Sequence, residues 1–372
     1  MSKAKQLADA GKISVAKRVG RREFLFTAIA GGLASSYLRG QVTPPRTNSS
    51  PGSVASDKTV KEVVTPNADF FVRNHFRTPK ISEAAWNLEI SGMVSTPLKL
   101  SYADLLLASS VRRPATLECA GNPTGGGGVG TAVWSGLSLA ELLKQSGLQP
   151  GATTVVFHGA DSGDGENLPP GTHYARAIPL EKAMDPSTLL AYEMNGGPLP
   201  ADHGFPLRAL VAGWYGMDSV KWLTRVEVLQ QPFRGYFQQE EYMSVGANGE
   251  RQLITRILVN SKFLRPSEGE EIKAKSYRAE GVAWAGERKI SKVEVRVDSG
   301  GAWQAANLPA SPVALVWTPW SFDWQIPRSG QYTLEVRATD DDGHVQPDVR
   351  DPGRKDFYEL NTPHRVSVNV RL

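Results

Sequence analysis

The chain has 372 residues, 40% hydrophobic and 22% charged, a globular composition that excludes a largely disordered chain. Its formal net charge is +4, but the first 22 residues hold seven Lys or Arg against Asp9 alone. The rest of the chain holds 35 basic and 37 acidic residues, so it lacks the charge excess of a nucleic-acid-binding protein.

The N-terminal segment has the pattern of an export signal. Arg21 and Arg22 are followed by Phe24 and Leu25, and then by a short run of small apolar residues. This order matches the twin-arginine signals with which bacteria export folded proteins, often loaded with a cofactor. The apolar run is too short to span a bilayer stably. We expect residues 1–45 to be a signal and spacer, removed on export to the periplasm; an amphipathic N-terminal helix is the alternative.

Residues 46–251 are predicted to form an α+β domain. Helix signals begin at Ser101 and at Ser138, where Ser138 is the expected N-cap and Glu141 occupies the capping-box position. An Asn195-Gly196 pair predicts a turn. Strand patterns occur at 86–90, 115–119 and 154–157. Strands and helices alternate too irregularly for a doubly wound sheet.

Residues 252–372 are predicted to be all β. Apolar and polar residues alternate strictly at 293–297, 334–338 and 365–370, and turn clusters separate these segments. No helical period appears. The pattern favours an immunoglobulin-like β-sandwich that lacks the usual disulfide, because the chain has one cysteine.

That cysteine, Cys119, is the most informative residue. A single cysteine excludes an intramolecular disulfide, a C-x-x-C-H haem attachment and a cysteine-rich zinc site. It ends a predicted strand and enters a glycine-rich loop, where a side chain is accessible and the backbone can approach a ligand. A thiolate is a soft ligand suited to transition metals. From the pattern alone, a buried and inert cysteine is the alternative.

Five segments together resemble the motif set of the sulfite oxidase family, in the family's order. They are Phe71-Val-Arg-Asn-His-Phe76, Leu117-Glu-Cys-Ala-Gly-Asn122, Leu190-Ala-Tyr-Glu-Met-Asn-Gly196, Pro198–Arg208 and Ser219-Val-Lys-Trp-Leu223. Five long motifs in register are far more specific than one short pattern. The resemblance covers roughly residues 67–372, and the sandwich resembles the family's dimerisation domain, which implies a homodimer.

The resemblance implies one pyranopterin molybdenum (molybdopterin) cofactor, with Cys119 as the protein ligand of the metal. The family's cofactor-binding positions fall on Phe71, Val72, Arg73, Asn74, His75, Cys119, Asp161, His203, Arg208, Ser219, Val220 and Lys221. The pterin ends in a phosphate, which Arg, Lys and His side chains can neutralise. Arg208 and Lys221 lie inside apolar segments, where charged side chains rarely stay unpaired.

The implied substrate pocket departs from the family. Arg73 matches a pocket arginine, Trp134 the pocket tryptophan and Tyr242 the pocket tyrosine. Directly after Cys-Ala-Gly-Asn, however, Pro123 and Thr124 replace two arginines of the vertebrate and plant enzymes. Arg354 is the nearest candidate for the C-terminal pocket arginine. We expect weaker attraction for a sulfur oxyanion, because a desolvated arginine contributes strongly to anion binding.

Two other patterns are less informative about function. Gly125, Gly127 and Gly130 satisfy G-x-G-x-x-G, but the next helix starts too late for a nicotinamide site, so a flexible wall of the molybdenum site is the favoured interpretation. His158, His173 and His344 lack metal-ligand spacing.

The favoured function is an oxidoreductase that oxidises sulfite or a related sulfur oxyanion. A molybdenum-dependent reductase of S- or N-oxides is the alternative within the class. A non-enzymatic exported binding module is the alternative of another class; a cysteine hydrolase is weaker, because no histidine is motif-paired with Cys119. The chain has no haem motif and too few cysteines for an iron–sulfur cluster, so electrons are expected to leave to a separate protein, a c-type cytochrome.

Overall fold

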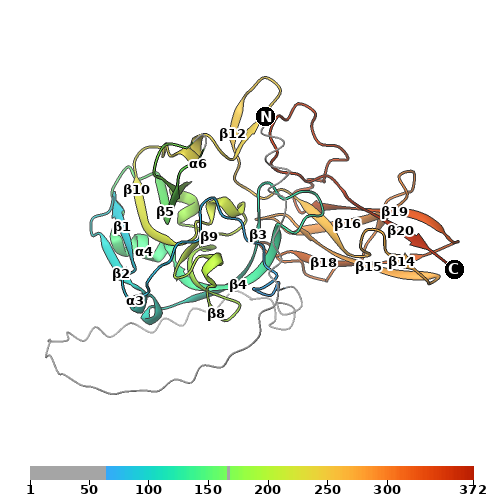
Figure 1. Cartoon of the computed structure of the whole chain (residues 1–372), viewed down its shortest axis with the longest axis horizontal. Helices are drawn as coiled ribbons and strands as arrows, with labels where there is room; N and C mark the ends of the chain where they lie inside the picture. Colours follow the sequence, from blue (N-terminus) through green and yellow to red (C-terminus); the bar gives the residue numbers. More distant parts are fainter. Residues whose placement is uncertain (1–63, 166–167) are drawn as a thin grey trace, which may run out of the picture. The chain divides into compact units, whose positions relative to one another are not determined.

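The computed structural model describes residues 64–165 and 168–372, so the predicted export signal lies outside the described residues. In the described part, strands dominate and helices are short (Figure 1). The helices are α3 (Tyr102–Leu107), α4 (Leu139–Ser146), α5 (Leu180–Ala183) and α6 (Tyr236–Gln239), with two 3-10 turns, η1 (Ala201–His203) and η2 (Gly216–Asp218). Among these residues, none of the helices is long and apolar enough to cross a membrane.

Two sheets build the N-terminal part of the described chain. The first has the order β2-β1-β10-β5-β6 and is antiparallel except between β1 and β10. Its strands are β1 (Asn87–Gly92), β2 (Leu98–Ser101), β5 (Thr154–Gly163), β6 (Thr172–Pro179) and β10 (Leu223–Leu229). The second has the order β3-β4-β7-β8, with β9 paired to β7. Its strands are β3 (Val111–Glu118), β4 (Val129–Ser138), β7 (Thr188–Met194), β8 (Gly197–Pro198) and β9 (Arg208–Val211). Every strand pairing in these two sheets is antiparallel except that between β1 and β10, which confirms that the described residues form no doubly wound parallel sheet. These residues contain less helix than the predicted α+β class suggests.

Local sequence accounts for the N-terminal ends of α3 and α4. Ser138 caps α4 as predicted, since its hydroxyl accepts the Glu141 backbone N–H at 3.3 Å. The predicted capping box at Glu141 is wrong, because that carboxylate bonds the Lys144 ammonium at 2.8 Å instead. A reciprocal capping box forms at α3, between Ser101 and Asp104.

The predicted Asn195-Gly196 turn joins β7 to β8. Asn195 has φ 56° and Gly196 has φ 84°, the pair of left-handed conformations that a tight hairpin turn requires. The Asn195 side chain also accepts the Val133 N–H at 2.8 Å and donates to the Thr65 carbonyl at 2.9 Å. The turn therefore holds the segment that precedes Phe71.

The C-terminal part is a β-sandwich, as predicted. One sheet contains β13 (Asn260–Arg265), β15 (Ser276–Trp284) and β18 (Thr318–Gln325). The other has the order β14-β20-β19-β16-β17, with β14 (Glu271–Ile272), β16 (Ile290–Val297), β17 (Gln304–Ala305), β19 (Gly330–Asp340) and β20 (His364–Val370). A core that includes Val295, Leu334 and Trp320 lies between them. The immunoglobulin-like type of this sandwich stays a prediction.

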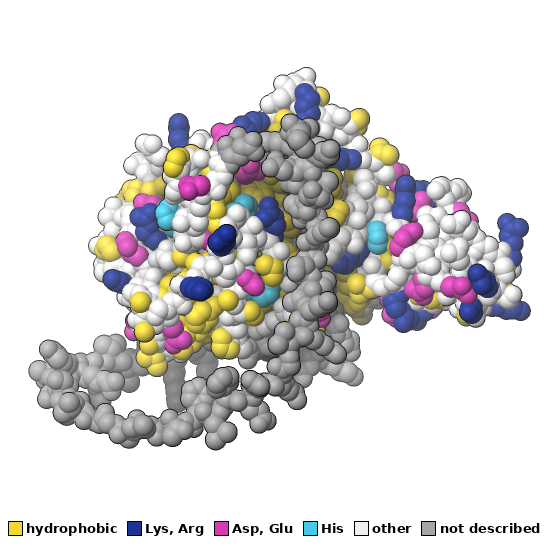
Figure 2. All heavy atoms as spheres, viewed as in Figure 1, with side chains coloured by type: hydrophobic (Ala, Val, Ile, Leu, Met, Phe, Trp, Pro, Cys, Tyr) yellow, Lys and Arg dark blue, Asp and Glu magenta, His cyan; other side chains and the backbone are white. Residues whose placement is uncertain are grey.

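A separate apolar cluster joins the two parts. Ala120, Tyr215 and Tyr242 of the N-terminal part pack in one buried cluster with Val282 and Trp284 of β15. The predicted domain boundary at residues 251 and 252 falls inside β12 (Arg251–Leu253), which pairs with β11 (Met243–Val245). On the face shown in Figure 2, basic and acidic side chains are interspersed. This distribution agrees with the nearly equal numbers of basic and acidic residues after residue 22.

Candidate active site

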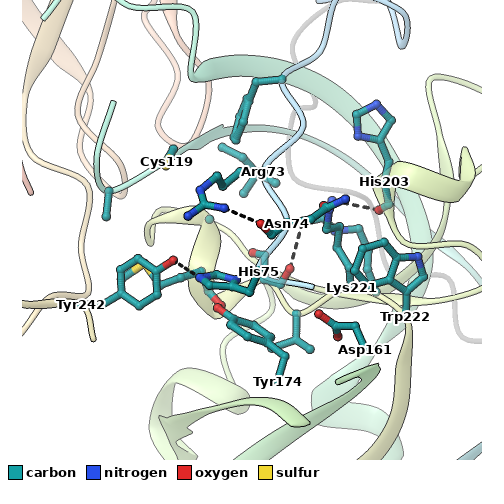
Figure 3. A pocket seen from close by; sticks show the side chains of 18 of the residues that line it. Arg73, Asn74, His75, Cys119, Asp161, Tyr174, His203, Lys221, Trp222 and Tyr242 are labelled. Atoms are coloured by element: carbon teal, nitrogen blue, oxygen red, sulfur yellow. Dashed lines mark hydrogen bonds between the residues drawn. The ribbon is translucent and has the colours of Figure 1, made fainter. Parts of the chain in front are cut away.

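The N-terminal part of the described chain contains a pocket of about 680 Å³, including the solvent at its mouth (Figure 3). The segments 70–75, 117–120 and 216–222 contribute most of its lining. The structure brings into this lining the predicted residues Phe71, Arg73, Asn74, His75, Cys119, Asp161, His203, Arg208, Ser219, Val220, Lys221 and Tyr242. Val72 and Trp134 do not line the pocket: Val72 is 45% exposed, and Trp134 is fully buried in the core.

Cys119 lies at one end of the pocket, directly after β3 ends at Glu118. Its backbone N–H donates to the Gly128 carbonyl at 2.8 Å, and its carbonyl accepts the Asn122 N–H at 2.8 Å. Burial raises the pKa of the thiol above its usual value. A buried thiol of this kind becomes a thiolate when a metal binds it, because coordination replaces the proton.

At the other end lie the buried Arg208 and the half-buried Lys221, which form no ion pair in the described part of the chain. Arg208 is 5% exposed and donates to the His203 carbonyl at 3.1 Å and the Ser219 carbonyl at 2.9 Å. No ion pair in the described part of the chain includes it. Burial lowers its pKa to about 9 and lowers that of Lys221 to about 7, with the Arg208 charge adding to the effect on Lys221. Lys221 donates to Asn74 Oδ1 and to the Asp202 carbonyl.

Asp161 adds an acceptor to the same pocket. Its Oδ1 is buried without a hydrogen-bond partner among the described residues. Burial raises the pKa of this carboxyl to about 6. A buried carboxylate oxygen without a donor, in the same pocket as Arg208 and Lys221, is costly unless a ligand satisfies it. A ring system rich in donors and ending in a phosphate meets these requirements, so the residues present fit a pterin cofactor.

Near Cys119, an aromatic group fixes Tyr242 (Figure 3). The Tyr242 hydroxyl lies 2.5 Å from Nε2 of His75, and the His75 ring stacks on Tyr174 with centroids 4.6 Å apart. Burial, with repulsion from the Arg73 charge, lowers the pKa of His75 to about 3, so its imidazole is neutral at pH 7. Tyr242 itself has φ 55°, a conformation that costs energy for a bulky residue and that its surroundings must impose.

One buried ion pair behind Tyr242 was not predicted. Arg176 and Asp218 are both fully buried and bond at 2.8 Å, and the Arg176 guanidinium lies 5.5 Å from the centroid of the Tyr242 ring. The sequence signal was present, since Arg176 sits between Ala175 and Ala177 in an apolar strand. The same reasoning singled out Arg208 and Lys221.

Three residues that the resemblance places at the substrate pocket do not line it in the structure. Thr124 does not line the pocket, and its hydroxyl lies 3.1 Å from that of Thr362. Arg354 does not line it either, and its charge is paired with Asp356 at 2.7 Å and Glu359 at 3.0 Å. The Trp134 ring lies 4.9 Å from the Arg208 guanidinium, on the far side of the pocket wall.

The glycine-rich loop also departs from the prediction of a flexible pocket wall. None of its residues from 121 to 130 lines the pocket. The Asn122 side chain accepts the Gly128 N–H at 2.8 Å, and a Cβ at Gly125 would overlap the His364 ring. Glycine at positions 125 and 128 therefore permits close packing of this loop.

Comparisons with known proteins now decide the family. Residues 75–237 match the model described as oxidoreductase molybdopterin binding domain, and residues 251–370 match the Mo-co oxidoreductase dimerisation domain. The chain belongs to the sulfite oxidase family of molybdenum enzymes. Human mitochondrial sulfite oxidase is 35% identical over 346 residues, which cover 82% of this chain and 62% of the human protein. The chain therefore spans about three fifths of the length of that relative.

Other proteins similar to this chain differ in the chemistry that their names state. Nitrate reductase [NADH] 1 of Arabidopsis thaliana is 32% identical over 334 residues, covering 77% of this chain and 36% of that protein. The crystal structure of the sulfane dehydrogenase SoxCD from Paracoccus pantotrophus superposes with a TM-score of 0.75 and 25% identity, covering 83% of this chain and 84% of that one. Family membership establishes an oxidoreductase with a molybdenum–pyranopterin cofactor, and leaves the non-enzymatic alternative unsupported.

Proposed function

We propose that this protein oxidises sulfite or a related sulfur oxyanion, and that it passes the electrons to a separate acceptor protein. The observation that carries the proposal is one pocket that holds Cys119, Arg73 and Tyr242 at one end and the unpaired cations Arg208 and Lys221 at the other. Named relatives that act on sulfite or sulfane sulfur favour a sulfur substrate. Sulfite and water would give sulfate, two protons and two electrons.

When bound, the molybdenum cofactor supplies oxygen-atom transfer coupled to the uptake of two electrons. Arg208 and Lys221 would hold its phosphate, Asp161 would accept from its ring system, and Cys119 Sγ would ligate the metal. These contacts use side chains that otherwise lack partners or carry uncompensated charge.

The residues near Cys119 would place the substrate. The guanidinium of Arg73 attracts an anion, and the neutral His75 holds the Tyr242 hydroxyl in one position. The Thr124 hydroxyl lies beside that of Thr362, and the Arg354 charge is already paired with Asp356. Arg73 would therefore bind the anion with fewer neighbouring positive charges than in arginine-rich relatives. We expect sulfite binding about ten- to a hundredfold weaker than in those enzymes, the effect of losing one charge-assisted contact.

A reductase of S- or N-oxides is the second candidate, and the nitrate reductase relatives favour it. Steady-state kinetics on purified protein with measured molybdenum content separates the two candidates. Sulfite with an oxidising dye tests the first, and sulfoxides, N-oxides or nitrate with a reduced dye test the second. Brisk reduction without sulfite oxidation would overturn the sulfite proposal and leave the cofactor standing.

We also propose a periplasmic homodimer that donates electrons to a c-type cytochrome. The dimerisation-domain match supports the dimer, and the twin-arginine pattern supports export. The single cysteine leaves no iron–sulfur relay within the chain, which supports an external acceptor. Light scattering on the mature protein tests the dimer, and a strictly monomeric mass at micromolar concentration would contradict it.

A further inference from the structure

The loop that follows Cys119 is held by the C-terminal sandwich. The Lys262 ammonium of β13 donates to the Gly126 carbonyl at 3.0 Å. The Glu359 backbone N–H donates to the Ala120 carbonyl at 2.9 Å. The sandwich therefore contacts the backbone of the loop near its start and again in its middle.

The strongest connection runs through Glu118, the residue directly before Cys119. Glu118 is 2% exposed. Its Oε2 accepts the Trp284 indole N–H at 2.8 Å, and its Oε1 lies 3.4 Å from the Asn260 side-chain nitrogen. Trp284 ends β15 and Asn260 begins β13, so two strands of the sandwich reach this one carboxylate.

The same carboxylate organises the loop from the inside. Asn122 donates to Glu118 Oε1 at 3.1 Å, and its own Oδ1 accepts the Gly128 N–H at 2.8 Å. The Gly128 carbonyl in turn accepts the Cys119 N–H at 2.8 Å. A Cβ at Gly128 would lie 2.8 Å from Asn122 Oδ1, so glycine permits this approach. The hydrogen bonds form a closed path from Glu118 to Cys119.

We propose that the sandwich positions Cys119 for the metal through Glu118, a role additional to dimerisation. The proposal rests on the assignment of Cys119 as the metal ligand. Glu118 is a positioning residue, since neighbouring Cα atoms are only about 3.8 Å apart and metal–ligand distances tolerate errors of about 0.2 Å. A buried carboxylate that loses a donor must shift or admit water, and either change moves Cys119.

The test compares two tryptophan variants of the full-length, cofactor-loaded protein. Trp284→Phe removes the donor to Glu118. Trp320→Phe is the matched control: Trp320 is buried in the same sandwich on β18, and its indole nitrogen has no hydrogen-bond partner among the described residues. Because Cys119 is the only cysteine, an aromatic disulfide reagent reports on this thiol alone, and it reacts when the thiol leaves the metal.

We expect the thiol of Trp284→Phe to react about tenfold faster than that of the control, the factor that corresponds to leaving a buried acceptor without its donor. Molybdenum loss on dialysis should accelerate in parallel, while thermal melts should show that both variants remain folded at the assay temperature. Equal thiol reaction rates in the two variants would overturn the proposal.

Asn260→Ala removes the longer hydrogen bond to Glu118, together with the Asn260 hydrogen bonds to Ser261, Gln346 and Leu360. It should accelerate the thiol reaction by a smaller factor. If Trp284→Phe does not fold, this variant decides alone, and a rate equal to that of the unmodified protein overturns the proposal. A Cys119→Ser protein that keeps molybdenum and turnover would contradict the ligand assignment itself. The two failures are therefore distinguishable.

Discussion

Arg176 donates through Nε to Oδ1 of Asp218 at 2.8 Å, and neither side chain reaches solvent. The same guanidinium donates to the Phe237 carbonyl at 2.5 Å and lies over the Tyr242 ring. A charge pair in the core thus supports the aromatic wall of the pocket.

Asp218→Asn should cost about 3–5 kcal/mol in the free energy of unfolding, because it leaves the Arg176 charge buried without compensation. Glu240→Gln is the control, since it breaks the exposed Arg251–Glu240 pair and should cost under about 1 kcal/mol. Denaturant unfolding of both variants at neutral pH measures the difference. Equal costs would mean that the buried pair contributes no more than a surface pair.

Cys119→Ser should fold and keep much of the pterin, because Arg208, Lys221 and Asp161 would still hold it, yet turnover should be lost. Pterin fluorescence after release, metal analysis and dye-linked activity provide the three readouts. Ordinary activity in this variant would rule out Cys119 as the essential ligand.

Arg208→Met should weaken retention of the cofactor about ten- to a hundredfold, since a charge-assisted contact to the phosphate is removed while the side-chain volume is roughly kept. Arg225→Met is the comparison, because Arg225 is 41% exposed in its side chain and lies outside the pocket. The ratio of pterin to protein after gel filtration measures the effect. Full cofactor content in Arg208→Met would place the phosphate elsewhere.

Asp356 should make stability depend on pH in acid. Burial alone raises the pKa of this carboxyl, but hydrogen bonds from Arg354 and from the Val245 backbone outweigh burial and lower it to about 2. A folded-state pKa below the unfolded value of 3.8 stabilises the protein above pH 3.8, and the contribution disappears as the pH falls through about 2. Asp356→Asn should therefore cost about 1–2 kcal/mol at pH 7, with a gap to wild type that narrows between pH 4 and 2. A gap independent of pH would contradict this assignment.

Replacing both Arg21 and Arg22 by lysine should leave the precursor in the cytoplasm, because the export machinery reads the arginine pair. Cell fractionation and immunoblotting measure the distribution. Normal export of the double variant would mean that the N-terminal signal is of another kind.

Local sequence signals predicted much of the fold and much of the pocket lining. Ser138 and the Asn195-Gly196 turn act through neighbours in the chain, so their patterns can be interpreted without tertiary information. Glu141 was misassigned because a capping carboxylate and an i, i+3 partner for Lys144 are equally consistent with the spacing.

The remaining errors concern contacts between distant segments. Thr124 was placed near the substrate by its position in a motif, whereas Thr362, 238 residues further along the chain, determines where its side chain lies. Arg354 is the exception, since its partner Asp356 is only two residues away. Glu118 looked like an ordinary member of a strand, because its partners Asn260 and Trp284 are 142 and 166 residues further along the chain. No local pattern encodes such distances.

The hydrogen bond between His75 and Tyr242 spans 167 residues, and that between Glu118 and Trp284 spans 166. A nascent chain therefore has no complete pocket lining until Tyr242 has left the ribosome, and no Glu118–Trp284 hydrogen bond until Trp284 has followed. We expect loading of the cofactor to be a late event of biogenesis, because a chain stalled before residue 208 would lack both cations that would hold the phosphate.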